Sequence, residues 1–220
     1  MTTTKQRINP SKLLQVLANV GGWIPLAILL VQFFTNNLGF NPVNTILKRT
    51  GRYAVLFLIL SLTITPIRKI LKLNVIYRLR KPLGLFAALY AGLHFATYAI
   101  WDFQLDLNLI WRAMIDNLFI LIGAVALLIL IVLAGTSFRK IQKKMGKTWV
   151  WLHRAVYLAA VLVILHYLLA IKGDLLTLQG NYTQPLIAAG VLLVLFILRI
   201  PWVVRSLNHL IKRQERVQSQ

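Results

Sequence analysis

Three of the four histidines of this chain, His94, His153 and His166, lie in or beside long apolar stretches. Histidine is the commonest metal ligand, and an ionisable side chain is costly inside a bilayer unless it has a function. The chain contains no cysteine, which excludes disulfides, thiolate nucleophiles, iron–sulfur clusters and cysteine-ligated zinc. Any metal chemistry must therefore use histidine, and these three residues predict a buried metal or haem.

The elements that must hold these histidines are apolar helices. Of the 220 residues 58% are hydrophobic, and six uncharged stretches are long enough for the roughly 20 residues that cross a hydrocarbon core. We expect helices at about 19–36, 52–68, 83–101, 117–136, 150–171 and 185–204. The first stretch is too long for a cleavable signal peptide, so residues 1–18 are expected to form a short basic tail.

The domain organisation follows from the same stretches. We find no internal repeat, low-complexity tract or linker in the sequence, and no loop is long enough to bury a core of its own. All six tryptophans fall near the expected helix ends, where their amphipathic rings favour the membrane interface. The prediction is one all-α domain over residues 1–220, an integral membrane bundle of six helices.

The distribution of charge predicts the orientation of this bundle. The chain carries 25 Lys and Arg against 5 Asp and Glu, and 18 of the 25 lie before residue 19, in 68–81, in 139–147 and after 204. Cytoplasmic loops carry the Lys and Arg excess, so both termini are expected in the cytoplasm. The positive charge is not gathered on a soluble domain, which argues against a nucleic-acid partner and for membrane lipid.

Depth in the membrane decides which histidines can work together. With this orientation the third and fifth helices run in the same direction, and His94 lies 8 residues before Asp102 while His166 lies 6 before Lys172. At 1.5 Å per residue both lie about 10 Å from the outer boundary. Two imidazoles at one level predict a b-type haem with His94 and His166 as axial ligands, not covalently attached because no cysteine is present.

His153 occupies a different level. It lies 13 residues before His166, which places it about 20 Å deeper and, on an ideal helix, about 140° away, so a shared face would require a bend. The third helix offers no second histidine at that level. Two interpretations of His153 stay open: a metal ligand, or an interfacial histidine bonded to a carbonyl, a quinone, a flavin or a haem propionate. His94 and His166 have an alternative as interhelical hydrogen bonds, and His209 is expected to be solvated.

Several segments carry a family resemblance. They are Thr50-Gly51-Arg52, Thr65-Pro66, Arg80 to Leu85 continuing through Tyr90 to Leu93-His94 and Tyr98, and Gly146 to Trp149 with Leu152-His153-Arg154, Tyr157 and His166-Tyr167. With these segments the chain resembles the ferric-reductase-like transmembrane superfamily. Within that superfamily it is most similar to the MsrQ (YedZ) family of haem-binding membrane subunits. The resemblance covers almost the whole chain, including its length and six-helix layout.

The resemblance implies a location in the bacterial inner membrane, a cofactor, partners and functional residues. It implies heme b, FMN as a second cofactor, and electron delivery to a periplasmic molybdopterin reductase of the MsrP type that repairs methionine sulfoxide in oxidised proteins. Electrons would come from the quinone pool or from a cytosolic flavin reductase. His94, His153 and His166 match the functional histidines of the family, and we expect one haem because the third helix contains only His94.

The sequence favours an electron-transfer subunit whose partner performs the substrate chemistry. Oxidases of the superfamily append a nucleotide-binding domain, whereas this chain has no Gly-x-Gly-x-x-Gly motif and no catalytic residue is predicted. Arg78, Arg80 and Lys147 are candidates for binding a flavin phosphate, with charges that only set the topology as the alternative.

Two other functions remain open. One is a haem-containing metal or quinol oxidoreductase with a different acceptor. The other is a cofactor-free transporter or scaffold. A transporter should show inverted repeats and broken helices, whereas Pro25 is the only proline expected well inside a span, and the sequence halves show no resemblance.

Overall fold

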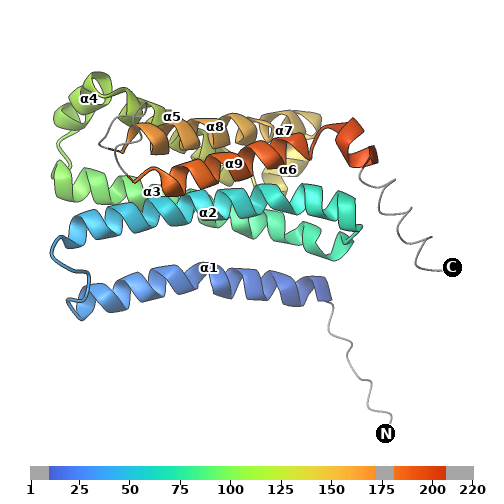
Figure 1. Ribbon diagram of the computed structural model, residues 1–220, viewed down its shortest axis with the longest axis horizontal. Coiled ribbons are helices and arrows are strands. Elements are labelled where there is room, and N and C mark those ends of the chain that lie inside the picture. Colours follow the sequence, from blue (N-terminus) through green and yellow to red (C-terminus); the bar gives the residue numbers. More distant parts are fainter. Residues whose placement is uncertain (1–9, 172–180, 207–220) are drawn as a thin grey trace, which may run out of the picture.

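The computed structural model describes residues 10–171 and 181–206, and in this part of the chain every regular element is helical (Figure 1). The helices are α1 Pro10–Phe34, α2 Pro42–Leu71, α3 Arg80–Thr97, α4 Leu107–Asp116, α5 Leu118–Gly135, α6 Arg139–Met145, α7 Lys147–Leu152, α8 Ala155–Leu169 and α9 Thr183–Ile197. A 3₁₀ turn at Asn74–Leu79 precedes α3, and a π-helical turn at Tyr98–Asp102 extends it.

The prediction of a helical membrane bundle is confirmed. Within the described residues, five helical segments are long and apolar enough to span a bilayer, namely α1, α2, 74–102, α5 and 147–169. The sixth expected span corresponds to α9, which has 15 residues and is followed, after a short turn, by further helix at 201–206. Together with α9, the described residues therefore contain six apolar helical segments, of which the last is shorter than expected.

Two helical hairpins form the centre of the bundle. Helix α2 packs along α3, α5 packs along α8, and α9 contacts both α2 and α8 (Figure 1). Their shared core contains Tyr90, Ala87 and Ala159, none of which has exposed surface, together with Leu62. Alanines at these positions let the helix axes approach closely, as small residues do in membrane bundles.

Helix α1 joins this core through one contact region. Only Gly22 and Leu29 of α1 are buried, and the hydroxyl of Tyr90 donates a hydrogen bond of 2.8 Å to the Gly22 carbonyl. A Cβ at position 22 would lie 2.1 Å from the ring of Phe86, so glycine is needed there. The remaining apolar side chains of α1 are mostly exposed, as expected of a helix that faces lipid.

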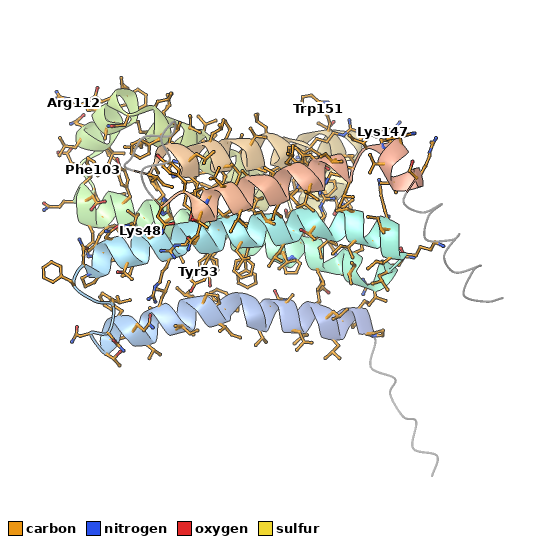
Figure 2. All side chains as sticks on the ribbon, in the orientation of Figure 1. Lys48, Tyr53, Phe103, Arg112, Lys147 and Trp151 are labelled. Atoms are coloured by element: carbon orange, nitrogen blue, oxygen red, sulfur yellow. The ribbon has the colours of Figure 1, made fainter. Side chains whose placement is uncertain are left out.

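The two ends of the bundle differ in charge. The first and last described residues, Pro10 and Ser206, lie at the same end as α6 and α7, and α4 lies at the opposite end (Figure 1). Lys147 and Trp151 are at the first end and Arg112 is at the α4 end (Figure 2). The carboxylates of the described segments, Asp102, Asp106 and Asp116, all flank α4. We call the α6–α7 end inner and the α4 end outer, following the charge rule.

Two predicted helix starts are wrong by about ten residues. Helix α1 begins at Pro10 instead of residue 19, so residues 10–18 are not a tail. Helix α2 begins at Pro42 instead of residue 52, because the side chain of Asn41 accepts a hydrogen bond of 3.0 Å from the Asn44 backbone N–H and caps the helix. Charged residues such as Lys48 and Arg49 ended the apolar stretch without ending the helix.

Two further differences concern the loops and the fifth span. The expected loop at 102–116 contains α4, which Asp106 caps by accepting bonds of 2.8 and 3.1 Å from two backbone N–H groups. The expected helix at 150–171 is broken at His153 and Arg154, between α7 and α8. Residues 1–9 and the predictions for Lys172 and His209 lie outside the described residues.

Candidate metal centre

The structure brings His94 of α3 and His166 of α8 next to each other. Their ring centroids are 6.0 Å apart and the ring planes are inclined by 81°. The two residues come from the two central hairpins, so the pair lies between them. The common level expected from the spacing along the chain is therefore present in the fold.

Each imidazole is held by the backbone of a neighbouring helix. The Nδ1 atom of His94 is 2.8 Å from the carbonyl oxygen of Leu47, and Nδ1 of His166 is 2.7 Å from the carbonyl oxygen of Phe119. A carbonyl can only accept, so Nδ1 carries the proton in both rings and Nε2 carries the free lone pair. Neither Nε2 makes a hydrogen bond within the described part of the chain.

This donor set fits the two axial positions of one haem iron. A metal–imidazole bond is about 2 Å long and the ring centre lies about 1 Å behind the nitrogen, so two axial rings have centres about 6 Å apart. The observed separation is 6.0 Å. Metal-ligating histidines usually donate their second N–H to a carbonyl or a carboxylate, as both do here. The interhelical hydrogen bonds are thus compatible with a ligand role.

A centre built only from protein ligands is not supported. No group of three or more His, Asp or Glu side chains that could hold a metal ion occurs among residues 10–171 and 181–206. A porphyrin supplies four of the six ligands of its iron, so two histidines suffice for haem and not for a bare ion.

Two glycines to which the sequence analysis assigned no role at the site face the histidines. A Cβ on Gly51 of α2 would lie 3.1 Å from Nδ1 of His94, and a Cβ on Gly123 of α5 would lie 2.6 Å from Nδ1 of His166. Each glycine follows by four residues the residue whose carbonyl binds the ring. Each imidazole therefore packs directly against the backbone of the neighbouring helix, at a position where glycine provides no side chain.

The two hairpins repeat the same arrangement, which makes the expectation of no internal repeat wrong. Each histidine follows its carbonyl partner by 47 residues. At equal distances within the two hairpins stand further pairs of buried residues: Ala54 and Ala126, Leu58 and Leu130, Ala87 and Ala159. The repeat is confined to buried positions. It is not evident when whole segments are compared, because the lipid-facing residues between these positions only need to be apolar and therefore differ between the two hairpins.

His153 lies far from this pair, at the inner end of the fifth span. From His166 it is about 20 Å along α8 at helical rise. Its ring stacks on Trp149 with centroids 4.0 Å apart, and its Nδ1 is 3.1 Å from the Trp149 carbonyl oxygen. Its Nε2 is buried and makes no hydrogen bond of normal geometry within the described residues, although the Leu133 backbone lies close enough to interact with the imidazole. A buried unpaired nitrogen is costly, so His153 is a candidate for binding a ligand.

Arg199, just after α9, is a second inner-end residue that sequence analysis did not single out. Its guanidinium donates hydrogen bonds to the Tyr157 hydroxyl and the Leu62 carbonyl and lies 4.7 Å from the Tyr157 ring centre. Its Nε is buried without a partner in the described segments. Arg80 is close enough to interact electrostatically with both His153 and Arg199. A charged residue within an apolar stretch is the feature of the sequence that could have identified Arg199 as a candidate.

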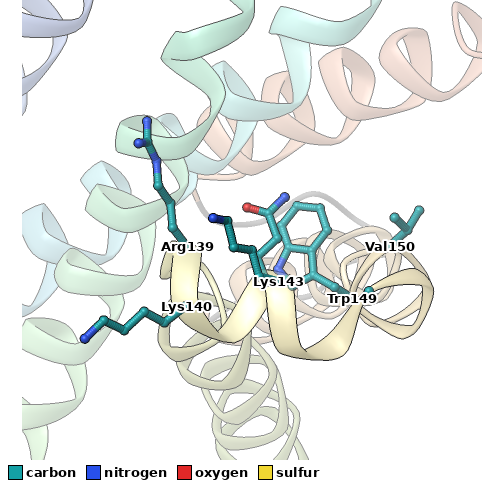
Figure 3. Close-up of a pocket in the computed structure, with 7 residues that line it drawn as sticks. Arg139, Lys140, Lys143, Trp149 and Val150 are labelled. Atoms are coloured by element: carbon teal, nitrogen blue, oxygen red, sulfur yellow. The ribbon is translucent and has the colours of Figure 1, made fainter.

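The inner end also carries a basic hollow of about 670 Å³ (Figure 3). It is lined by Arg139, Lys140, Gln142, Lys143, Gly146, Trp149 and Val150. The three residues expected to bind a flavin phosphate, Arg78, Arg80 and Lys147, are not in this lining, and Arg78 and Lys147 are exposed. Trp149 links the hollow to the site of His153, because its ring is part of the wall and stacks on that histidine.

The fold and the site define a class of protein: a multi-pass helical membrane protein with a facing pair of histidines between two hairpins. A family model described as "Ferric reductase like transmembrane component" matches residues 50–165. The matched residues cover most of both hairpins and include His94 and His153. His166 follows the matched stretch directly.

Three curated relatives extend the match to most of the chain, and all are named "Protein-methionine-sulfoxide reductase heme-binding subunit MsrQ". The protein from Herminiimonas arsenicoxydans is 36% identical over 90% of this chain and 89% of its own. The relative from Rhodospirillum rubrum is 38% identical over 83% and 85%, and that from Caulobacter vibrioides is 33% identical over 91% and 94%. The chain therefore belongs to the ferric-reductase-like transmembrane family and, within it, to the MsrQ heme-binding subunits.

Proposed function

We propose that this protein is a b-haem electron-transfer subunit that passes electrons across the membrane to a periplasmic methionine-sulfoxide reductase. The facing pair of His94 and His166, with both Nε2 atoms free at the separation of axial ligands, carries the proposal. The names of the three relatives, which are heme-binding subunits of such a reductase, support the choice of acceptor.

In this function the chain positions the cofactor and excludes water. Haem, when bound, supplies one-electron chemistry. The Leu47 and Phe119 carbonyls fix the tautomer and orientation of the two imidazoles, which also raises the basicity of Nε2. The apolar helices around the pair keep the site dry. The reduction of methionine sulfoxide itself would take place on the partner, a molybdopterin-containing reductase of the MsrP type.

The acceptor would dock at the outer end of the bundle. That end contains α4, whose Leu107, Trp111 and Ile115 are exposed, and it carries the three described carboxylates. His94 and His166 precede this end by less than three helical turns in α3 and α8, so the acceptor comes near the proposed haem.

The donor would act at the inner end, either as a quinone or through a cytosolic flavin reductase. The unpaired Nε–H of Arg199 can donate to a quinone carbonyl. The unpaired Nε2 of His153 can accept from a quinol hydroxyl or bind a further cofactor, because its Nδ1 donates to the Trp149 carbonyl. FMN is the second cofactor that we propose, with its phosphate bound by Arg78, Arg80 and Lys147 or by the cations of the hollow in Figure 3.

Titration with flavins tests the FMN proposal. We expect FMN to bind at least about tenfold more tightly than riboflavin, which lacks the phosphate, because a charge-assisted contact is worth about 1.5–3 kcal/mol. Arg139→Gln with Lys143→Gln, compared with Arg78→Gln with Lys147→Gln, shows which set binds the phosphate, and Lys48→Gln at the outer end is the control. Equal affinity for FMN and riboflavin would refute a phosphate site.

Spectroscopy followed by reoxidation tests the function itself. Purified in mild detergent, the protein should show a low-spin b-type spectrum when oxidised and when reduced with dithionite, with one haem per chain. Under anaerobic conditions the reduced form should be reoxidised only when both a periplasmic molybdopterin reductase and methionine sulfoxide are added. Reoxidation by ferric chelates alone would support a metal reductase, and a protein without haem even after reconstitution would indicate a transporter or scaffold.

A further inference from the structure

We propose that Gly51 and Gly123 are positioning residues, which seat the two axial imidazoles and hold their planes nearly perpendicular. We call each glycine, with the carbonyl four residues before it, a seat: Leu47 with Gly51 and Phe119 with Gly123. The inference rests on the proposed haem function, and it adds what determines the orientation of the ligands.

The first observation is how a seat works within a helix. The N–H of residue i donates to the carbonyl of residue i−4, so the Leu47 carbonyl already accepts from Gly51, and it also accepts from His94 at 2.8 Å. The Thr50 hydroxyl reaches the same oxygen at 3.1 Å but lies closer to the Ile46 carbonyl, at 2.8 Å. The Cα–Cβ bond of a helical residue tilts towards the N-terminus, over the turn that contains this carbonyl. A side chain at position 51 or 123 would therefore occupy the place of the imidazole.

The second observation is that the two seats differ in tightness. A Cβ at position 51 would lie 3.1 and 3.2 Å from Nδ1 and Cε1 of His94, whereas a Cβ at position 123 would lie 2.6 and 2.8 Å from the same atoms of His166. His166 is further confined by the Phe119 ring, whose centroid is 6.0 Å away. A methyl group at Gly123 must therefore displace the imidazole, while one at Gly51 needs only a small adjustment.

The third observation is that the seats are specific to these two glycines. An added Cβ would meet a histidine only at Gly51 and Gly123 among the glycines of the described helices. Beyond the neighbouring residues and the backbone of the same helical turn, no heavy atom lies within 4 Å of a Cβ added at Gly21, Gly92, Gly135 or Gly190. Both seats have the same 47-residue spacing to their histidine, one on each hairpin. Together they set the interplanar angle of 81°.

The angle between the ligand planes has a spectroscopic signature. Low-spin ferric haem with perpendicular imidazole planes gives a single, strongly anisotropic low-field signal in electron paramagnetic resonance, whereas parallel planes give a rhombic spectrum. We therefore expect the low-field signal from the parent protein. A substitution that rotates one ring should move this signal, and a purely structural substitution should not.

Gly51→Ala and Gly123→Ala test the proposal, with Gly92→Ala and Gly135→Ala as controls that add the same methyl group in open space. Loss of the hydrogen bond that orients a metal-ligating histidine typically weakens metal binding by about 10- to 100-fold, and we expect Gly123→Ala to reduce haem affinity by that factor. Gly51→Ala should retain more haem and show a shifted low-field signal and reduction potential. Both controls should match the parent in all three measurements.

A second set of variants separates loss of the seat from failure to fold. In His166→Gly, added imidazole can take the ligand position without being tied to α8, so it should restore a low-spin spectrum. It should do the same in Gly123→Ala with His166→Gly, because a free ring can move away from the methyl group. Parent-like haem affinity, signal and potential in Gly123→Ala, or no rescue in the double variant, would overturn the proposal. A parent protein without haem would instead overturn the proposed function.

Discussion

His94→Ala and His166→Ala are each expected to abolish the low-spin b-type spectrum and to reduce haem retained on purification to background. Each substitution removes one of the two imidazoles, whose ring centroids are 6.0 Å apart, and with it one free Nε2. The haem would then be held by one axial bond and by apolar contacts alone. The hydrogen bond between the imidazole Nδ1 and the backbone carbonyl is lost together with the ring on that side. The measurement is haem content per chain, with the reduced spectrum of the fraction that remains.

The matched control for these variants is His209→Ala, which removes the fourth histidine of the chain. It should retain the haem content and spectrum of the parent. His153→Ala distinguishes one haem from two: with one haem on His94 and His166, its haem content is unchanged. A low-spin spectrum that persists in both His94→Ala and His166→Ala would contradict the assignment of this pair.

Tyr90→Ala should destabilise the bundle by about 3–5 kcal/mol, the usual cost of truncating a buried aromatic side chain. Tyr90 has no exposed surface, stacks on Phe57 at 5.3 Å and binds the Gly22 carbonyl of α1. The substitution therefore opens a cavity in the core and removes one of the polar contacts of α1, another being the hydrogen bond from Arg49 to Gln32. Unfolding in mixed detergent micelles, followed by tryptophan fluorescence, measures the free energy.

Two further variants show which interaction of Tyr90 is responsible for the loss of stability. Tyr90→Phe keeps the ring and removes only the hydrogen bond, so it should cost about 1 kcal/mol. Tyr77→Ala truncates the same residue type at a position where 49% of the side chain's surface is exposed, and it should have little effect. If Tyr90→Ala were no more destabilising than Tyr77→Ala, the core described around Tyr90 would be wrong.

The spans and the histidine pair were predictable because both depend on quantities that a sequence carries directly. Apolar length predicted the spans, and the constant rise of a helix placed His94 and His166 at one level. Helix starts depend instead on local hydrogen bonds. Asn41 before Pro42, and Asp106 before α4, are capping signals that a hydropathy pattern does not register.

The seats were beyond the sequence for a different reason. A glycine in an apolar helix has many explanations, and only the packing of α2 against α3 and of α5 against α8 shows which glycines face an imidazole. Once the two hairpins are aligned with each other, the equal spacing from Gly51 to His94 and from Gly123 to His166 identifies the two glycines as equivalent positions. Arg199 is similar, since its partners Tyr157 and Leu62 come from other helices.

The carbonyl bonds of His94 and His166 bear on the order in which the protein is assembled. Both imidazoles are oriented by backbone groups of their own chain, so their alignment does not depend on contacts with the cofactor. Ordering a flexible side chain on binding costs about 0.5–1.5 kcal/mol, and two pre-oriented ligands avoid most of that cost. Insertion and folding of the chain can therefore precede delivery of the cofactor, and a stock of finished apoprotein can be loaded when haem becomes available.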